Sequence, residues 1–509
     1  MTASEPTAIV ELLGRGEAGA PAILAPGRPA LDYAALRAML PEVTGALRAR
    51  GIGPEDRVAI VLPNGPEAAT AFLALACAAA TAPLNPAYRE EELDFYLDDL
   101  KAKAVLVGPE ERGPVVRVAE RRGMEILRLG TAEGGPAGLL RLVGGPPVAP
   151  SPDPDATALF LHTSGTTSRP KLVPLSHANL VASARHIGQT LALSPADRCL
   201  NIMPLFHIHG LVAAVLASLA AGGSVFCTPG FNALRFFAWL EEARPSWYTA
   251  VPTMHQAILA RAERNPETVA RAGLRLIRSS SASLPPQVMR ALETTFRCPV
   301  IESYGMTEAA HQMTSNPLPP AARKPGSVGL PAGPLVRIAD PLAPVLRGPG
   351  EIGEVVISGP DVTKGYEANP EANAKAFFEA EGRRWFRTGD EGVFDEEGYL
   401  RLTGRLKEII NRGGEKVSPL EVDEVLMDHP AIAQCVTFAI PHEKLGEEVG
   451  AAVVLREGAS AGEQEIRAFA AERLADFKVP RRVVILPEIP KGATGKLQRI
   501  GLAQRLGLA

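Results

Sequence analysis

Glycine and proline residues divide this chain into short apolar runs from one end to the other. The 509 residues include 48 Gly and 46 Pro, and the apolar runs between them alternate between helix-like and strand-like lengths. Such alternation is typical of α/β proteins. Because a chain of this length exceeds one ordinary hydrophobic core, two or more domains are expected. We therefore predict a large N-terminal α/β domain with several subdomains over residues 1–403.

The C-terminal part of the chain has shorter alternating elements. Ser418 is followed by Pro419 and, three residues on, by Glu421, a pattern that predicts the start of an amphipathic helix. Strand-like runs follow at residues 433–440, 450–455 and 482–486, and a helix-like run at residues 461–475. This pattern predicts a small α+β domain over residues 409–509. The boundary between the two domains is expected near residues 404–407.

Composition excludes several classes of protein. A hydrophobic fraction of 46% and a formal net charge of -4 indicate a packed chain that does not bind nucleic acid. The number of cysteines is odd, they are widely spaced, and no C-x-x-C occurs among Cys77, Cys199, Cys227, Cys298 and Cys435. This spacing argues against a disulfide framework or a zinc site and fits a reducing compartment.

No targeting segment or membrane span is predicted. The N-terminus lacks a basic start followed by an apolar stretch, and the C-terminus lacks a Ser-Lys-Leu address, so a cytoplasmic protein is expected. The longest uncharged runs, residues 68–84 and 211–226, are rich in Ala and Gly and fall short of the roughly 20 apolar residues of a membrane helix. We predict that both runs are buried helices.

A loop rich in hydroxyl groups is the first candidate for function. Residues 163–171 (TSGTTSRPK) lie between two strand-like runs. Backbone N–H groups and hydroxyls in such a loop can donate to phosphate oxygens while Lys171 supplies charge. The loop is not a Walker motif, since no helix can begin before Ser176. Taken alone, it would be read as a polar surface hairpin.

Together with six later segments in the same order, this loop resembles the adenylate-forming superfamily, which includes acyl-CoA synthetases, luciferases and peptide-synthetase adenylation domains. The segments are residues 204–207 (PLFH), 304–308 (YGMTE), 354–359 (EVVISG), 387–390 (RTGD), 404–407 (GRLK) and 490–496 (PKGATGK). The resemblance implies that ATP activates a carboxylic acid as its acyl-adenylate, with Mg²⁺, and that the acyl group passes to coenzyme A. Leu172 departs from the family, which usually has glycine there.

The resemblance also implies roles for single residues. Lys496 matches the lysine that reaches the α-phosphate of ATP during adenylation, and Tyr304 matches the residue that stacks on adenine. Thr307 is expected at the α-phosphate, and Thr167 and Glu308 at Mg²⁺. Further nucleotide contacts are expected from Thr163, Ser164, Gly165, Thr166, Lys171, Ser281, Ala282, Ser283, Glu302, Ser303, Gly305, Met306, Asp390 and Arg405, the last two near the ribose. Taken singly, Tyr304 would be a core aromatic, Asp390 a turn residue and Lys496 a solvated lysine.

Domain alternation is a further implication of the resemblance. Lys407 matches a hinge at residues 404–408. One orientation of the C-terminal domain would present Lys496 for adenylation, and the other would present residues 411–416 to form the CoA channel. Gly413 and Gly414 in that segment would let the pantetheine arm pass close to the backbone.

The expected acid site is unusually polar. Residues 279–284 (SSSASL), 308–313 (EAAHQM) and 247–255 (WYTAVPTMH) carry hydroxyls and imidazoles. A long alkyl chain would leave such groups unpaired at roughly 1–3 kcal/mol each. A second carboxylate would instead accept from them.

These segments resemble the oxalate:CoA ligase branch of the superfamily. Within that branch, residues that match Ser281 and His311 contact the distal carboxylate, and the residue that matches His207 lies at the reacting end. Each histidine taken alone would be read as a satisfied structural residue. Other short acids stay open as substrates, namely malonate, glycolate or a short-chain fatty acid. An enzyme that loads a carrier protein and a nucleotide sensor also stay open, as does the choice between monomer and homodimer.

Overall fold

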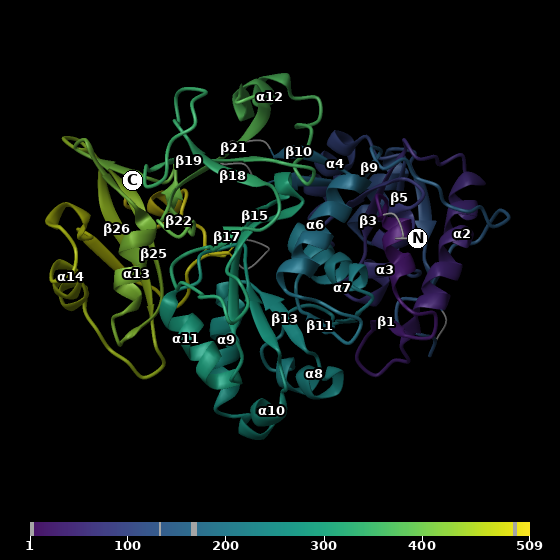
Figure 1. Cartoon of the computed structure of the whole chain (residues 1–509), viewed down its shortest axis with the longest axis horizontal. Helices are drawn as coiled ribbons and strands as arrows, with labels where there is room; N and C mark the ends of the chain where they lie inside the picture. The colour runs from purple at the N-terminus through teal and green to yellow at the C-terminus, as the bar shows by residue number, and fades with distance from the viewer. Residues whose placement is uncertain (1–4, 132–133, 164–169, 492–495) are drawn as a thin grey trace.

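A computed structural model describes residues 5–131, 134–163, 170–491 and 496–509. A large N-terminal domain of mixed sheets and helices is followed by a smaller C-terminal domain, which confirms the predicted fold class. In Figure 1 the chain begins on the right, and the C-terminal domain with β25, β26, α13 and α14 lies on the left. The hinge at residues 404–408 stays a prediction, and its first two residues belong to the end of a strand, β22 (Leu400–Arg405).

A nine-stranded sheet forms the middle of the N-terminal domain. Its strands follow the order β17-β16-β15-β14-β13-β11-β12-β1-β2, and six neighbours from β15 to β1 run parallel. The strands are β1 (Pro21–Leu24), β2 (Leu31–Asp32), β11 (Arg198–Asn201), β12 (Ser224–Cys227), β13 (Trp247–Ala250), β14 (Leu276–Ser279), β15 (Val300–Met306), β16 (His311–Ser315) and β17 (Leu330–Pro331). Helices α8 (Phe236–Ala243), α9 (Pro252–Ala262) and α11 (Pro286–Phe296) pack on one face through a separate apolar cluster.

A six-stranded sheet with the order β10-β9-β4-β3-β5-β6 lies beside it. Its strands are β3 (Arg57–Val61), β4 (Ala80–Pro83), β5 (Ala104–Val107), β6 (Glu125–Arg128), β9 (Thr157–Thr163) and β10 (Lys171–Ser176). One apolar cluster joins the two sheets through α2 (Tyr33–Arg48), α3 (Pro66–Ala76), α6 (His177–Thr190), the π-helical segment η2 (His209–Leu216) and α7 (Ala217–Ala220). In Figure 1, α3, α6 and α7 lie between the two sheets, and α2 lies at the right-hand edge.

The prediction that residues 68–84 and 211–226 are wholly helical was wrong in part. Each run begins in a helix and ends in a buried strand, β4 in the first and β12 in the second. Sequences rich in Ala and Gly have no clear hydrophobic periodicity. A single helix and a helix followed by a short buried strand therefore cannot be told apart from such a sequence. Among the described residues, no helix is long and apolar enough to cross a membrane.

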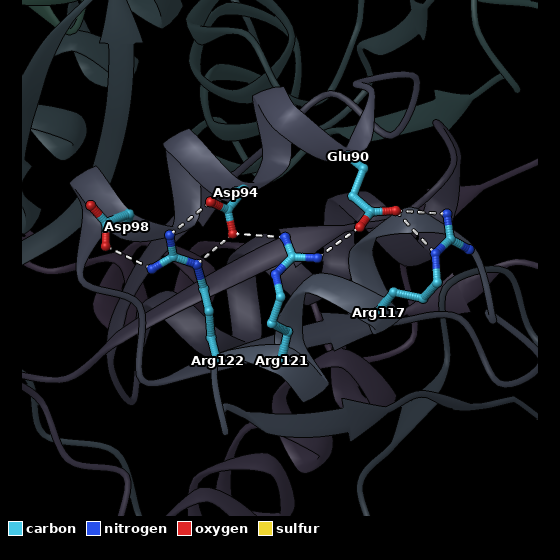
Figure 2. A network of polar contacts seen from close by, with 6 residues as sticks. All are labelled: Glu90, Asp94, Asp98, Arg117, Arg121 and Arg122. Carbon is cyan, nitrogen blue, oxygen red and sulfur yellow. Dashed lines mark hydrogen bonds and ion pairs between the residues drawn. The ribbon is translucent and has the colours of Figure 1, made fainter.

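Helices α4 (Glu90–Leu100) and α5 (Pro114–Arg121) cover the outer face of the six-stranded sheet. Their apolar sides pack on β3 and β5. Their polar sides are joined by a ladder of ion pairs, in which three arginines of one segment meet three acids of the other (Figure 2). Arg122 lies 2.8 Å from Asp94 and 2.6 Å from Asp98. Because the ladder is exposed and screened by solvent, apolar packing holds this pair of helices to the sheet more than charge does.

Besides a two-stranded sheet of β7 (Gly130–Thr131) and β8 (Leu140–Arg141), the described residues form two sheets of five strands each. One joins β18 (Leu335–Ala339), β19 (Gly353–Ser358), β20 (Phe377–Ala380), β21 (Arg383–Phe394) and β22, all antiparallel. The C-terminal sheet contains β23 (Ile410–Arg412), β24 (Glu415–Val417), β25 (Ile432–His442), β26 (Gly446–Leu455) and β27 (Arg482–Ile485), with helices α13 (Pro419–Met427), α14 (Glu463–Ala471) and α15 (Leu502–Arg505). The predicted cap is present, since the Ser418 side chain accepts from the Glu421 N–H and α13 begins at Pro419.

The hairpin of β15 and β16 is packed closely enough to require a glycine. Gly305 pairs with Gln312 across the hairpin, at a point where the register shifts. A Cβ atom on Gly305 would lie 1.7 Å from the carbonyl oxygen of His311. The backbones can therefore approach only if residue 305 has no side chain, and this approach places His311 against the parallel sheet.

We expect Gly305→Ala to lower the free energy of unfolding by about 1–3 kcal/mol, because the added methyl group forces the hairpin apart. Thermal and urea unfolding, followed by circular dichroism, measure the change. Gly108→Ala is the matched control, since a Cβ there meets nothing within 4 Å, and it should change stability by less than about 0.5 kcal/mol. Equal losses in the two variants would contradict the close approach.

Candidate active site

The predicted phosphate loop closes a hairpin between two strands of the six-stranded sheet. Thr163 at the end of β9 pairs with Lys171 at the start of β10. The candidates Ser164, Gly165, Thr166 and Thr167 lie outside the described residues. The ammonium of Lys171 lies 4.3 Å from the centre of the Tyr366 ring, and burial lowers the pKa of this lysine.

Leu172 is a buried strand residue. Its side chain is 5% exposed and belongs to the apolar cluster under α4 and α5. Its carbonyl accepts from the Glu367 N–H at 2.9 Å. The position that departs from the superfamily pattern is therefore used for packing, and a leucine adds apolar contacts that glycine could not make.

Carboxylates and cations gather next to the end of β15. Glu308, in the short turn η3 (Thr307–Ala309), is buried and accepts from the Tyr366 hydroxyl at 2.9 Å. Burial raises the pKa of Glu308, and Lys171 and Arg405 oppose that rise. Tyr366 donates to Oε1, so this contact leaves the other oxygen of the carboxylate, Oε2, for a cation.

Tyr304 and Asp390, which come from different sheets, are joined directly. The Tyr304 hydroxyl donates to Asp390 Oδ2 at 2.5 Å, and Arg405 pairs with Asp390 Oδ1 at 3.0 Å. Asp390 is buried, at 6% exposure. Both of its oxygens thus already have a protein partner, and a ribose hydroxyl would share this carboxylate with them.

Lys496 enters the same site from the C-terminal domain. Burial and, to a smaller extent, Arg405 lower its pKa to about 8, although Asp390 and Glu308 act in the opposite direction. The pKa of His207 is lowered to about 3 by burial and by the charge of Lys496. The two domains therefore place a lysine, a histidine and two carboxylates close enough to change each other's protonation.

A second polar group surrounds Ser281, which has a positive φ of 74°. His209 Nδ1 lies 3.0 Å from Ser281 Oγ, and His209 Nε2 lies 2.6 Å from Thr249 Oγ1. The rings of His209 and His311 pack edge to face with centroids 4.9 Å apart. We call Thr249, His209, Ser281, His311 and Arg278 the histidine cluster.

Arg278 and His209 were missed by the sequence analysis. Arg278 is fully buried in β14, and no described residue forms an ion pair with it. Burial lowers its pKa to about 9. One signal in the sequence could have identified Arg278: it follows two apolar residues in a strand-like run. Charged residues are rarely buried in a strand unless they have a partner or a function. His209 had no signal of its own beyond lying two residues after His207.

The other expected nucleotide contacts divide into two groups. Glu302 and Ser303 form hydrogen bonds within the sheet: Glu302 accepts from the Leu284 N–H at 2.8 Å, and the Ser303 carbonyl accepts from Ser280 at 2.8 Å. Burial raises the pKa of Glu302 to about 8. The residues of the second group are partly buried or exposed, so a ligand can reach them. They are Ala282, Ser283, Gly305, Met306 and Thr307.

The expected CoA glycines form the turn between β23 and β24. Gly413 and Gly414 both have positive φ, 61° and 96°. The neighbour of Gly413 is Leu445, of the same domain. Lys407, in the proposed hinge, lies near enough to Lys171 to lower its pKa. The structure thus groups Lys496, rather than the two glycines, with the N-terminal residues.

Comparisons with known proteins agree over most of the chain. The AMP-binding enzyme family matches residues 14–367, and the AMP-binding enzyme C-terminal domain matches residues 421–496. The sequence is 47% identical to oxalate–CoA ligase of Arabidopsis thaliana, over 89% of each chain. It is 42% identical to oxalate–CoA ligase of Saccharomyces cerevisiae, over 88% of this chain and 87% of that protein. The crystal structure of ATP-bound MatB from Rhodopseudomonas palustris has a TM-score of 0.87 at 30% identity and covers 98% of both chains.

We expect Lys496 to lose its proton near pH 8, well below an ordinary lysine, because burial disfavours its charged form. Its acylation by an amine-reactive reagent should therefore rise steeply between pH 7 and pH 9, as measured by peptide mass spectrometry. Asp390→Asn removes a negative charge that favours the ammonium, so the curve should move to lower pH. A curve that stays in place would contradict the contact between the two domains.

Proposed function

The chain belongs to the AMP-binding enzyme family, and on this premise we propose that it is an ATP-dependent, AMP-forming acid:CoA ligase whose acid is oxalate. One observation carries the proposal. Lys496 from the C-terminal domain and His207 from the N-terminal domain lie within electrostatic reach of each other, beside the histidine cluster. A cation and polar donors are thus assembled where a carboxylate and a phosphate would meet.

The reaction needs two steps because a carboxylate is a poor electrophile. In the first, a carboxylate oxygen of the acid bonds to the α-phosphorus of ATP, and the bond from that phosphorus to the bridging oxygen breaks, which releases pyrophosphate. In the second, the thiol of CoA loses its proton and attacks the acyl carbon, and AMP leaves. Negative charge accumulates on the α-phosphate in the first step, and Lys496 and Thr307 would stabilise it.

The nucleotide would be held by groups from both domains. Tyr304 offers its ring to adenine, and Asp390 and Arg405 offer a carboxylate and a guanidinium to the ribose. The hydroxyls of the loop at residues 163–167 and the ammonium of Lys171 would hold the phosphates. Glu308, through the oxygen that Tyr366 does not contact, and Thr167 would hold Mg²⁺, which when bound neutralises charge on the phosphate oxygens.

Oxalate is the acid that the histidine cluster favours. Burial and nearby cations hold the pKa of His209 and of His311 well below the ordinary value, so both rings are neutral and each carries one donor. Ser281 and His311 would bind the distal carboxylate, and His207 would lie at the carboxylate that reacts. The two relatives named above act on oxalate, which supports the same choice.

Domain alternation would separate the two steps. The arrangement described here would serve adenylation, because Lys496 lies with the N-terminal residues. A rotation about residues 404–408, with Lys407, would then present Gly413 and Gly414 to the pantetheine arm. We place the enzyme in the cytoplasm, as a monomer or homodimer. Its cysteines, which are all free and buried, support a reducing compartment.

In an ATP-dependent assay of CoA-thioester formation, we expect oxalate to have the highest kcat/KM among oxalate, malonate, glycolate and propionate. The reason is that glycolate and propionate lack a second carboxylate and leave its donors unpaired, at roughly 1–3 kcal/mol each, while malonate carries its second carboxylate one carbon farther away. Turnover of propionate without turnover of oxalate would refute the choice of acid. Activity only with a carrier protein, and not with free CoA, would refute the CoA ligase.

Lys496→Ala should abolish adenylate formation almost completely, because the α-phosphate loses its countercharge, while thioester formation from pre-made acyl-adenylate is largely retained. Pyrophosphate exchange measures the first step and CoA-thioester formation the second. Lys491→Ala is the control: this lysine, five residues earlier, pairs with Glu488 at 2.9 Å and should leave both rates unchanged. A Lys496→Ala variant that keeps its exchange rate would show that adenylation does not need this lysine, and a wild-type protein without exchange would be a nucleotide-binding protein without this chemistry.

A further inference from the structure

Arg278 is a buried cation at the centre of the histidine cluster. It is 0% exposed, and its contacts with described residues are all with neutral groups. One of its nitrogens, Nε, has no hydrogen bond among them. Burying an uncompensated charge is unfavourable by several kcal/mol, so a role that needs this charge is expected.

Gln312 holds the guanidinium in place. Its Oε1 atom accepts from Arg278 Nη2 at 3.2 Å, while its amide nitrogen donates to Thr190 and to the Ala332 carbonyl at 3.1 and 2.9 Å. These two donations fix which end of the Gln312 amide faces the arginine. Arg278 is thereby held between β13 and β16, with its donors aimed at both strands.

One chain of hydrogen bonds runs from Arg278 to Ser281. Guanidinium can only donate, so Thr249 Oγ1 accepts from Arg278 Nη1, at 3.5 Å. The Thr249 hydroxyl proton then points to His209 Nε2, at 2.6 Å, and the proton of this neutral ring lies on Nδ1. His209 Nδ1 donates to Ser281 Oγ at 3.0 Å. The hydroxyl proton of Ser281 is left to donate elsewhere.

A second, shorter chain runs through His311. Arg278 Nη2 lies 3.4 Å from His311 Nδ1, so this nitrogen accepts. Because the ring is neutral, its proton lies on Nε2. No described residue forms a hydrogen bond with that nitrogen. Both chains therefore end in a free donor.

We propose that Arg278 sets the polarity of the acid site: it orients both chains so that Ser281 and His311 donate outward, and its charge is balanced by the second carboxylate of the acid. Arg278 is thus a positioning residue that selects doubly charged acids. This inference rests on the proposed function and deepens it. A monocarboxylate of the same size would leave one donor pair and the buried cation without a partner.

The test compares two acids that differ only at the distal carbon, oxalate and glycolate. In Arg278→Met, kcat/KM for oxalate should fall about 100-fold, while kcat/KM for glycolate and KM for ATP stay within about threefold. The melting temperature should not fall, because a buried charge is replaced by an apolar chain of similar length. Equal losses for both acids together with a lower melting temperature would show a structural role and overturn the proposal.

Arg275→Met is the matched control. This arginine lies three residues earlier and pairs with Asp197 at 3.0 Å. Its loss should lower the melting temperature and leave the oxalate-to-glycolate ratio of kcat/KM unchanged. A ratio that collapses in this variant too would mean that any disturbance of β14 has the same effect, which would also overturn the proposal.

The pH profile gives a signature that a structural role would not produce. His311 is faced by Arg278, His207, His209 and Lys496. Without Arg278 its pKa should rise, so that a larger fraction of His311 is protonated at pH 6 than at pH 8 and supplies part of the missing charge. In Arg278→Met, kcat/KM for oxalate relative to wild type should therefore rise roughly threefold or more from pH 8 to pH 6. Adding His311→Gln should remove this rise, and a rise that persists would contradict the proposal.

Wild-type selectivity separates failure of this inference from failure of the proposed function. If the wild-type enzyme rejects oxalate but accepts malonate, oxalate is the wrong acid, and the same ratio is measured with malonate and 3-hydroxypropionate. A large drop of that ratio in Arg278→Met would support the inference. If the wild-type enzyme turns over singly charged acids at least as well as doubly charged ones, the inference is overturned.

Discussion

Buried positive charge organises this active site. Lys496 from one domain lies near His207, His209 and His311, and Arg278 from the other lies near His209 and His311. Together with burial, the two cations hold all three rings neutral. Cations enclosed in this way are unfavourable unless anions accompany them. Asp390 and Glu308 supply part of the balance for Lys496, and nothing among the described residues does so for Arg278. A site with such an excess of charge suits two polyanionic ligands, a nucleoside triphosphate and a dicarboxylate.

The hairpin of β15 and β16 brings the two halves of the site together. The first strand presents Tyr304 to Asp390, the turn presents Glu308 to Tyr366, and the second strand presents His311 to Arg278. The strands can approach because Gly305 has no side chain. The contacts proposed for the nucleotide and for the acid therefore share one short segment, and a change in its register would move both.

Local patterns predicted some elements well and others badly. The Ser418 cap and the short C-terminal elements were predicted, since an N-cap acts within one helical turn. The Ala-rich runs that end in β4 and β12 were predicted as helices throughout, because helix and buried strand differ there only in their tertiary partners. The loop sequence does not explain why Leu172 departs from the family pattern. The explanation is that its side chain packs in the apolar cluster under α4 and α5.

By itself, the sequence determined the α/β class and the order of the nucleotide motifs, because phosphate loops and turns use short contiguous segments whose residue types are dictated by chemistry. It also singled out Ser281, His207 and His311. Only the tertiary structure decided that Thr249, His209, Arg278 and His311, from four separate elements, form two directed chains of hydrogen bonds. The physical reason is that burial and the balance of charge depend on neighbours distant in sequence, and no local pattern records them.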